Sequence, residues 1–126
     1  MKIAQDAGTG GNRFTGYGDG YVEVNRTRHT QSLVVSGDRV VVDWPAASVA
    51  SLNADHIAAL VDFAPEIVLL GTGATFAFPE PALLAPLYKA GIGVEVMDTP
   101  AACRTFNILL AEGRNVVAAL IVTPSS

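Results

Sequence analysis

The sequence predicts a single α/β domain, and three observations support this class. Sequence patterns predict antiparallel β-strands in the first half of the chain, and in the second half helix and strand patterns alternate. Alternation of this kind is typical of parallel strands joined by crossover helices. The chain has 126 residues, of which 50% are hydrophobic, enough to bury one core without disulfide bonds. We expect one domain over residues 18–126, preceded by a flexible arm at residues 1–17.

The first half supplies the arm and three strands. Residues up to Tyr17 are rich in Gly, Asn and Thr without an apolar period, which indicates the arm. Apolar patterns then predict strands at 21–24, 33–35 and 40–42, with turns at Asn25 and at Ser36-Gly37-Asp38. Trp44-Pro45 ends this region, because proline cannot donate a hydrogen bond to a strand ladder. An exposed strand edge here could pair in a homo-oligomer, or Glu23 and the arginines could guard it.

A helix and a buried strand are predicted next. Asn53 can cap the helix, Leu52 and Ile57 can form a hydrophobic staple, and Pro65 ends it. Residues 67–70 are continuously apolar, as in a central strand covered on both faces. The helix that follows this strand is short or kinked, because Pro86 interrupts its pattern.

The last strand–helix–strand unit carries the clearest local signals. A strand is expected at 94–97, and Thr99 and Pro100 mark the start of a helix because they suit its cap and first position. Gly113 supplies the left-handed residue that ends the helix, and a final strand is expected at 116–122. Short crossovers place parallel strands side by side, so the turn after Leu70 and the start of the last helix should share one edge of the sheet.

That edge defines a candidate ligand crevice. Its members are the turn residues and the residues around the helix start: Gly71, Thr72, Gly73, Thr75, Asp98, Thr99, Cys103 and Arg104. The turn lacks the dinucleotide fingerprint, since Phe76 replaces the third glycine, so a tight turn and an anion site both stay open. Asp98 can act as a base or stabilise the helix start.

Cys103 is the lone cysteine and has two interpretations. The first turn of a helix lowers a thiol pKa, which would favour a thiol-dependent enzyme. Cys103 also shares a helix face with Phe106 and Leu110, which favours core packing. A lone cysteine and the absence of an apolar leader predict a cytoplasmic protein.

Composition argues against several function classes. The net charge of −4 disfavours nucleic acid as a partner. The longest apolar run, 116–122, is far shorter than the roughly 20 residues of a membrane helix, so we expect no membrane insertion. The two histidines, His29 and His56, form no zinc pattern with Cys103, and we expect no metal and no cofactor.

A non-catalytic protein-interaction module is the leading functional hypothesis. Phe76, Phe78 and Pro79, together with Tyr88, would form an apolar surface for a protein partner, because exposed aromatic residues are costly without a purpose. The alternative structural interpretation is that both phenylalanines fold back onto the core. The alternative function is a small-molecule or anion-binding protein, or a thiol-dependent enzyme, that uses the crevice.

The second half resembles a known family of unknown function. The residues that carry the resemblance are Leu70-Gly71-Thr72-Gly73, Gly91 through Thr99, Ala101 through Asn107, and Leu109 through Arg114. The family includes a mitochondrial respiratory complex I assembly factor and an adipogenesis-associated protein. Its members often have tyrosine where Phe106 stands, and the segment Asn25 to His29 is more basic here than is usual among them.

The resemblance covers the chain from about Gly20 to Ile121 and implies a more specific architecture. It implies a three-layer single domain with a central mixed sheet, crossover helices and an N-terminal antiparallel β layer. The assembly-factor member adds weight to the interaction hypothesis, by analogy of fold. The mitochondrial role is not expected directly, since no Arg-rich, Ser-rich transit segment is present.

Overall fold

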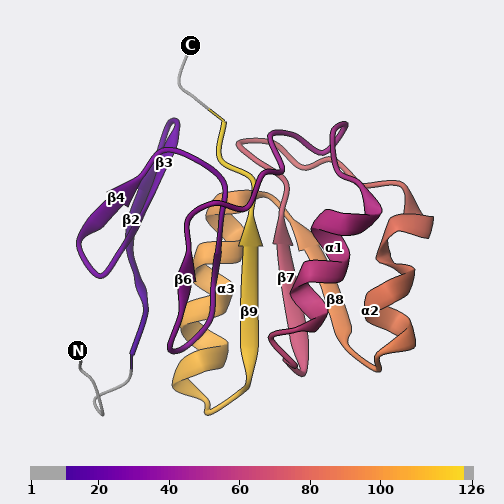
Figure 1. Ribbon diagram of the computed structural model, residues 1–126. Coiled ribbons are helices and arrows are strands. Elements are labelled where there is room, and N and C mark those ends of the chain that lie inside the picture. Colours follow the sequence, from indigo (N-terminus) through magenta and orange to yellow (C-terminus); the bar gives the residue numbers. More distant parts are fainter. Residues whose placement is uncertain (1–10, 124–126) are drawn as a thin grey trace.

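A five-stranded mixed sheet forms the centre of the computed structural model, which describes residues 11–123 (Figure 1). Its strand order is β6-β5-β9-β7-β8. The strands are β5 (Leu33–Val35), β6 (Val40–Val41), β7 (Ile67–Gly71), β8 (Gly93–Met97) and β9 (Val116–Leu120). β7 runs parallel to both β8 and β9, whereas β5 is antiparallel to β9 and to β6. The predicted central mixed sheet is therefore confirmed.

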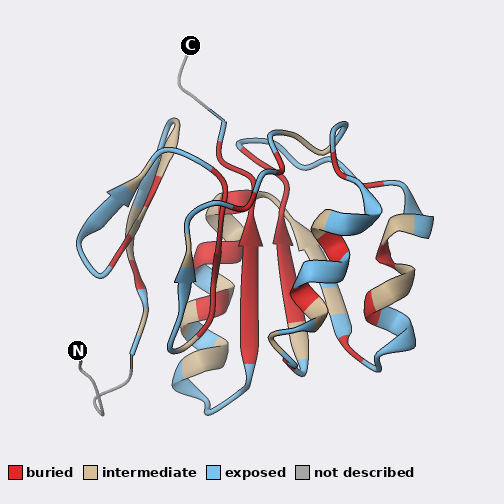
Figure 2. Ribbon diagram, viewed as in Figure 1, coloured by how far each residue is buried: buried red, intermediate tan, exposed pale blue. Residues whose placement is uncertain are grey.

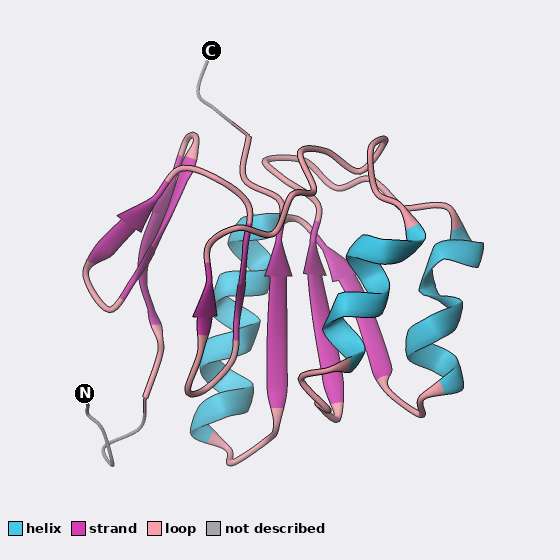
Figure 3. Cartoon of the chain, in the orientation of Figure 1, coloured by secondary structure: helices cyan, strands magenta, loops and turns pink. Residues whose placement is uncertain are grey.

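Helices and a second sheet cover the two faces, which gives three layers (Figure 3). The helices are α1 (Ala54–Val61), the 3-10 turn η1 (Pro81–Leu84) with α2 (Ala85–Lys89), and α3 (Thr99–Ala111). α1 and α2 lie on one face, and α3 lies on the other. Beside α3 stands a three-stranded antiparallel sheet of β2 (Phe14–Gly18), β3 (Tyr21–Val24) and β4 (Thr27–His29). This arrangement confirms the predicted α/β fold with an N-terminal β layer.

The hydrophobic core lies on both faces of β7 and β9, two neighbouring interior strands (Figure 2). Every residue of β9 is buried, as the continuous apolar pattern predicts. On one face the strands pack against Ile57 and Leu60 of α1 and Leu87 of α2. On the other face they pack against Phe106 of α3, and the three-stranded sheet closes this side of the core.

The predicted flexible arm is too long at its C-terminal end. Residues 14–17 belong to β2, while residues 1–10 lie outside the described residues. Phe14 is buried and packs edge-on against Phe106, with ring centroids 5.2 Å apart. The Asn107 side chain bonds both backbone groups of Phe14, at 2.8 Å each. Residues 93 positions apart make these contacts, so the local sequence pattern could not reveal them.

The helix starts follow the predictions with one correction. Asn53 caps α1 in a reciprocal capping box with His56, and Pro86 marks the change from η1 to the short α2. The cap of α3 is Asp98, whose carboxylate accepts a hydrogen bond from the Ala101 amide at 2.8 Å. Thr99 is the first helical residue instead of the cap, because its hydroxyl is bonded elsewhere.

Candidate functional site

The carboxyl ends of β7 and β8 meet at one edge of the sheet, as predicted. Gly71 stands opposite Met97 in the parallel register, and the Thr72 amide donates to the Met97 carbonyl at 2.9 Å. We call the turn Gly71-Thr72-Gly73 together with Asp98 and Thr99 the rim. The rim is a real structural unit assembled from segments more than twenty residues apart.

Thr99 joins three segments at the rim. Its hydroxyl accepts a hydrogen bond from the Gly73 amide at 2.9 Å and donates one to the Ile121 carbonyl at 2.8 Å. Its own amide donates to the Gly73 carbonyl at 2.8 Å. An anion site needs free donors that point at the ligand. The amides of Gly73 and Thr99 are already bonded within the fold, so the rim acts as a junction.

Gly71 permits the close packing of this junction. A Cβ atom at this position would lie 2.8 Å from both the Thr99 hydroxyl oxygen and a methyl carbon of Leu120. Real Cβ atoms almost never approach other heavy atoms so closely. Glycine at this position therefore lets β7, β9 and the start of α3 come together.

Thr72 shapes the loop that leaves the rim. Its buried hydroxyl donates to the Thr75 carbonyl at 2.8 Å and accepts from the Ala77 amide at 3.2 Å. This loop carries Phe76 and Phe78, which are 58% and 55% exposed, with ring centroids 6.5 Å apart. We call residues 74–79 the aromatic loop. The two rings point outward from a backbone that the Thr72 side chain holds in place.

The other two residues of the predicted partner surface, Pro79 and Tyr88, do not form one exposed surface with Phe76 and Phe78. Pro79 is buried, so it anchors the aromatic loop and offers no surface to a partner. Tyr88 is exposed, but it lies near the end of α2. That helix returns the chain to the opposite end of the sheet, where β8 begins (Figure 1). Among the four predicted residues, only Phe76 and Phe78 form an exposed pair.

Cys103 is buried against the sheet, as the core-packing interpretation predicts. Burial raises the pKa of its thiol to about 12, although the nearby Arg104 charge opposes this shift. The nucleophilic form of cysteine is the thiolate, so the thiol is unsuited to covalent chemistry near neutral pH. Arg104 itself points away and donates a hydrogen bond to the Tyr17 hydroxyl at 2.8 Å.

A cavity of about 260 Å³ does lie next to the rim, but its composition differs from the predicted crevice. Gly73 and Thr99 line it, whereas Asp98, Cys103 and Arg104 do not. The opposite wall comes from residues 17–22, the tip of the β2–β3 hairpin. Sequence reasoning predicted the strand at 21–24 but assigned residues 14–17 to the arm, so it missed the β2–β3 hairpin that forms this wall. The Gly18-Asp19-Gly20 turn between two tyrosines was the available signal.

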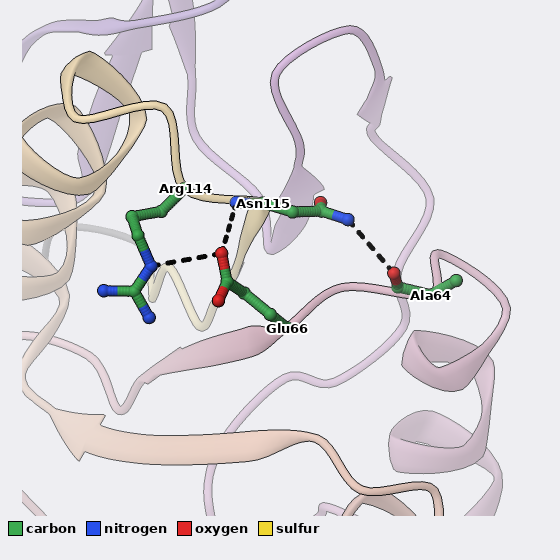
Figure 4. Close-up of polar contacts among 4 residues, drawn as sticks. All are labelled: Ala64, Glu66, Arg114 and Asn115. Carbon is green, nitrogen blue, oxygen red and sulfur yellow. Dashed lines mark hydrogen bonds and ion pairs between the residues drawn. The ribbon is translucent and has the colours of Figure 1, made fainter.

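A polar cluster lies at the amino ends of the strands, at the far end of the sheet (Figure 4). The Glu66 carboxylate accepts hydrogen bonds from the Arg114 guanidinium at 3.1 Å and from the Asn115 amide at 3.0 Å. Asn115 also donates to the carbonyl of Ala64, whose φ of 49° is left-handed. These bonds hold the two turns that lead into β7 and β9.

Within residues 11–123, no group of three or more His, Cys, Asp or Glu side chains could hold a metal ion. The helices of the same part of the chain are all too short or too polar to cross a membrane.

The curated proteins that are similar in sequence to this chain include two assembly factors and one bacterial protein. NADH dehydrogenase (ubiquinone) 1 alpha subcomplex assembly factor 3 of Bos taurus is 37% identical over 107 residues, which cover 75% of this chain and 58% of that protein. The Homo sapiens assembly factor 3 is 35% identical, over 76% of this chain and 59% of its own. The 13 kDa major membrane protein of Francisella tularensis is 29% identical, over 86% and 89%. The chain thus spans somewhat more than half the length of the assembly factors.

The solved structures that share the fold include two Bordetella proteins. A Bordetella parapertussis protein is 42% identical with a TM-score of 0.85, over 92% of this chain and 99% of that one. A Bordetella pertussis protein described as a Mth938-like domain is 37% identical with a TM-score of 0.79, over 100% and 95%. The family model described as "Protein of unknown function (DUF498/DUF598)" matches residues 14–121, nearly the whole described chain. The chain belongs to this DUF498/DUF598 family.

Proposed function

We propose that this protein is a non-catalytic assembly module that binds a protein partner through the aromatic loop. The observation that carries the proposal is the exposure of Phe76 and Phe78 on a backbone held by Thr72. Aromatic side chains dominate the energetics of protein interfaces, and a loop held in place before binding loses less entropy on association.

The relatives support a role of this class. The similar proteins of Bos taurus and Homo sapiens are named as assembly factors of NADH dehydrogenase. The rim also lacks free amide donors at Gly73 and Thr99, and Cys103 has a raised pKa. The first observation counts against anion binding at the rim, and the second counts against a thiol-dependent enzyme. The proposed compartment is the cytoplasm, which rests on the lone cysteine and is compatible with its burial.

Affinity capture from native lysate tests this proposal. The wild-type protein should retain at least one protein that the Phe76→Ala/Phe78→Ala variant loses by about ten-fold or more, since hot-spot aromatics contribute about 2 kcal/mol or more each. Ile108→Ala is the matched control, because Ile108 is also 58% exposed but lies on α3. Both variants should keep the wild-type unfolding midpoint. Identical sets of captured proteins from all three would contradict the proposal.

The cavity beside the rim favours a second candidate, a binder of a small apolar molecule. Apolar residues such as Val22, Ile121 and Val122 contribute to its lining, and its volume suits a single aromatic ring with short substituents. Ala74 is exposed and also lines the cavity, so Ala74→Trp should fill it. A screen of aromatic fragments by ligand-observed NMR should then give hits that Ala74→Trp abolishes. A screen without hits would eliminate this candidate.

A further inference from the structure

The two outer strands of the three-stranded sheet differ in whether their free edges are covered. Its order is β2-β3-β4, so β2 and β4 are both edge strands. At β2, the Asn107 amide accepts from the Phe14 N–H and donates to the Phe14 carbonyl, the two bonds that a neighbouring strand would make. At β4, the described residues supply no such cover (Figure 1). One edge is closed by α3, and the other is open.

The β3–β4 turn determines which backbone groups β4 exposes. Asn25 and Arg26 have φ values of 50° and 72°, the left-handed pair that a two-residue hairpin turn requires. Val24 and Thr27 flank the turn and form a hydrogen-bonded pair, and the pairs then alternate along the hairpin. Glu23 and Arg28 are the next pair, so the Arg28 N–H and C=O point away from β3 toward the open edge.

The side chains around this edge are basic. Arg26 and Arg28 are exposed, and Arg13 is exposed beside the turn, where its amide donates to the Asn25 side chain at 3.0 Å. The nearest carboxylate in the register is that of Glu23, but it accepts from the Thr15 hydroxyl on the β2 side at 2.9 Å. Within residues 11–123 none of these three arginines forms an ion pair with a carboxylate.

Arg28 is also held in an orientation suited to recognition. Its guanidinium lies over the Tyr21 ring, 3.7 Å from the centroid. Stacking on a ring leaves the N–H groups at the guanidinium edge free, and this planar fork matches a carboxylate with two parallel hydrogen bonds. The chain as a whole carries a charge of −4, so this cluster of arginines stands out from its surroundings.

These charges determine what can pair with the edge. If two copies paired through β4, the outward groups of Arg28 would bond those of the other Arg28, and two like charges would lie directly opposite. An acidic strand would instead place a carboxylate beside Arg28. We propose that β4 is a docking edge for an extended, acidic segment of another protein, which adds as a fourth strand with its carboxylates against Arg28, Arg26 and Arg13. This proposal does not depend on the aromatic loop.

A synthetic peptide tests the proposal. The probe is a fluorescent peptide of about eight residues with Glu alternating with Val or Thr, the length of an ordinary strand. We expect it to raise fluorescence anisotropy at low salt, and to slow hydrogen exchange of the Arg28 amide, as followed by NMR. A matched peptide with Lys in place of Glu should not bind.

Two further arms separate strand addition from simple charge attraction. N-methylation of the peptide on the side that faces β4 removes its donors but keeps its charges, and it should abolish binding. Arg28→Glu should weaken binding of the acidic peptide by about ten-fold or more, as expected when a charge-assisted pair becomes a repulsive one. Arg39→Glu is the matched control, because Arg39 is also exposed and stacks on a ring, that of Phe63, away from β4.

The outcomes are decisive in each direction. Selective loss in Arg28→Glu, together with a slowed Arg28 amide, supports the proposal. Failure of the acidic peptide to bind, equal binding of the N-methylated peptide, or equal loss in Arg39→Glu would overturn it. Arg28→Gln serves as a second variant if Arg28→Glu perturbs the wild-type NMR spectrum, and it should also weaken binding.

Discussion

The rim and the β3–β4 hairpin use their polar groups in opposite ways. At the rim, the Thr99 hydroxyl bonds both Gly73 and Ile121, and the surrounding residues are buried. At the hairpin, Arg26 and Arg28 are exposed along the edge of β4, and within residues 11–123 they have no carboxylate partner and no element covers that edge. Although the rim occupies the usual ligand position of an open α/β sheet, its hydrogen bonds hold the fold together. The hairpin leaves its polar groups available.

This difference shows that the edge of a sheet where ligands usually bind is not a binding site in every protein. The carboxyl edge of a parallel sheet is a binding site only where donors or side chains stay unbonded. Here the backbone donors of Gly73 and Thr99 are bonded, and the neighbouring aromatic loop provides the exposed groups. Substitutions at the rim should therefore affect stability, and substitutions at the loop and hairpin should affect binding.

Gly71→Ala should give the largest effect. The added methyl group would collide with Thr99 and Leu120, so we expect a loss of about 3 kcal/mol in the free energy of unfolding, measured by urea denaturation. Gly93→Ala is the control in the adjacent strand, because a Cβ atom there meets its nearest neighbour at an ordinary 3.5 Å. A loss below about 1 kcal/mol for Gly71→Ala would mean that the rim is loose enough to serve as a pocket.

Thr99→Val should follow, with a loss of about 2 kcal/mol, because it leaves the Gly73 amide and the Ile121 carbonyl buried without this partner. The same denaturation experiment measures it. Thr99→Ser keeps the hydroxyl and should recover most of the loss. If Thr99→Val were as stable as the wild type, the rim hydrogen bonds would contribute little, and the comparison with the hairpin would fail.

Cys103 should make stability depend on alkaline pH. Burial raises the pKa of its thiol from the ordinary 9.0 to about 12, so the folded state keeps a proton that the unfolded state releases. This contribution is complete below about pH 9 and is lost as the pH rises toward 12. Relative to Cys103→Ala, the wild type should lose about 1.4 kcal/mol per pH unit over that window. Parallel stability curves for the two proteins would show that the thiol is accessible to water.

The Glu66–Arg114 pair should give the smallest effect. The hydrogen bonds from Arg114 and from the Asn115 amide lower the pKa of the Glu66 carboxyl below its ordinary 4.5. Its contribution is therefore present above pH 4.5 and is lost as the pH falls through the lowered value. Both side chains are roughly half exposed, so Arg114→Ala should shift the urea midpoint only slightly, and high salt should reduce the difference. A large shift would reveal a second essential junction at the amino ends of the strands.

Local signals determined most of the elements. The N-cap at Asn53, the continuous apolar run of β7 and the left-handed glycine after α3 act within a few residues, so the sequence alone revealed them. The neighbouring positions of β7 and β8 also followed from their short connection. The class and the rim could therefore be predicted from the residues, whereas the three layers were implied by the family resemblance.

Only the tertiary structure decided what the rim and the N-terminal segment do. The bond from Thr99 to Ile121, the contact of Phe14 with Phe106 and the cavity wall at residues 17–22 join parts of the chain that lie far apart. Whether Cys103 is buried or reactive depends on the same long-range packing. Short-range rules describe how a segment folds, but the side chains that occupy its donors come from elsewhere in the chain. For that reason the sequence located the rim, and only the structure showed that its donors are already bonded.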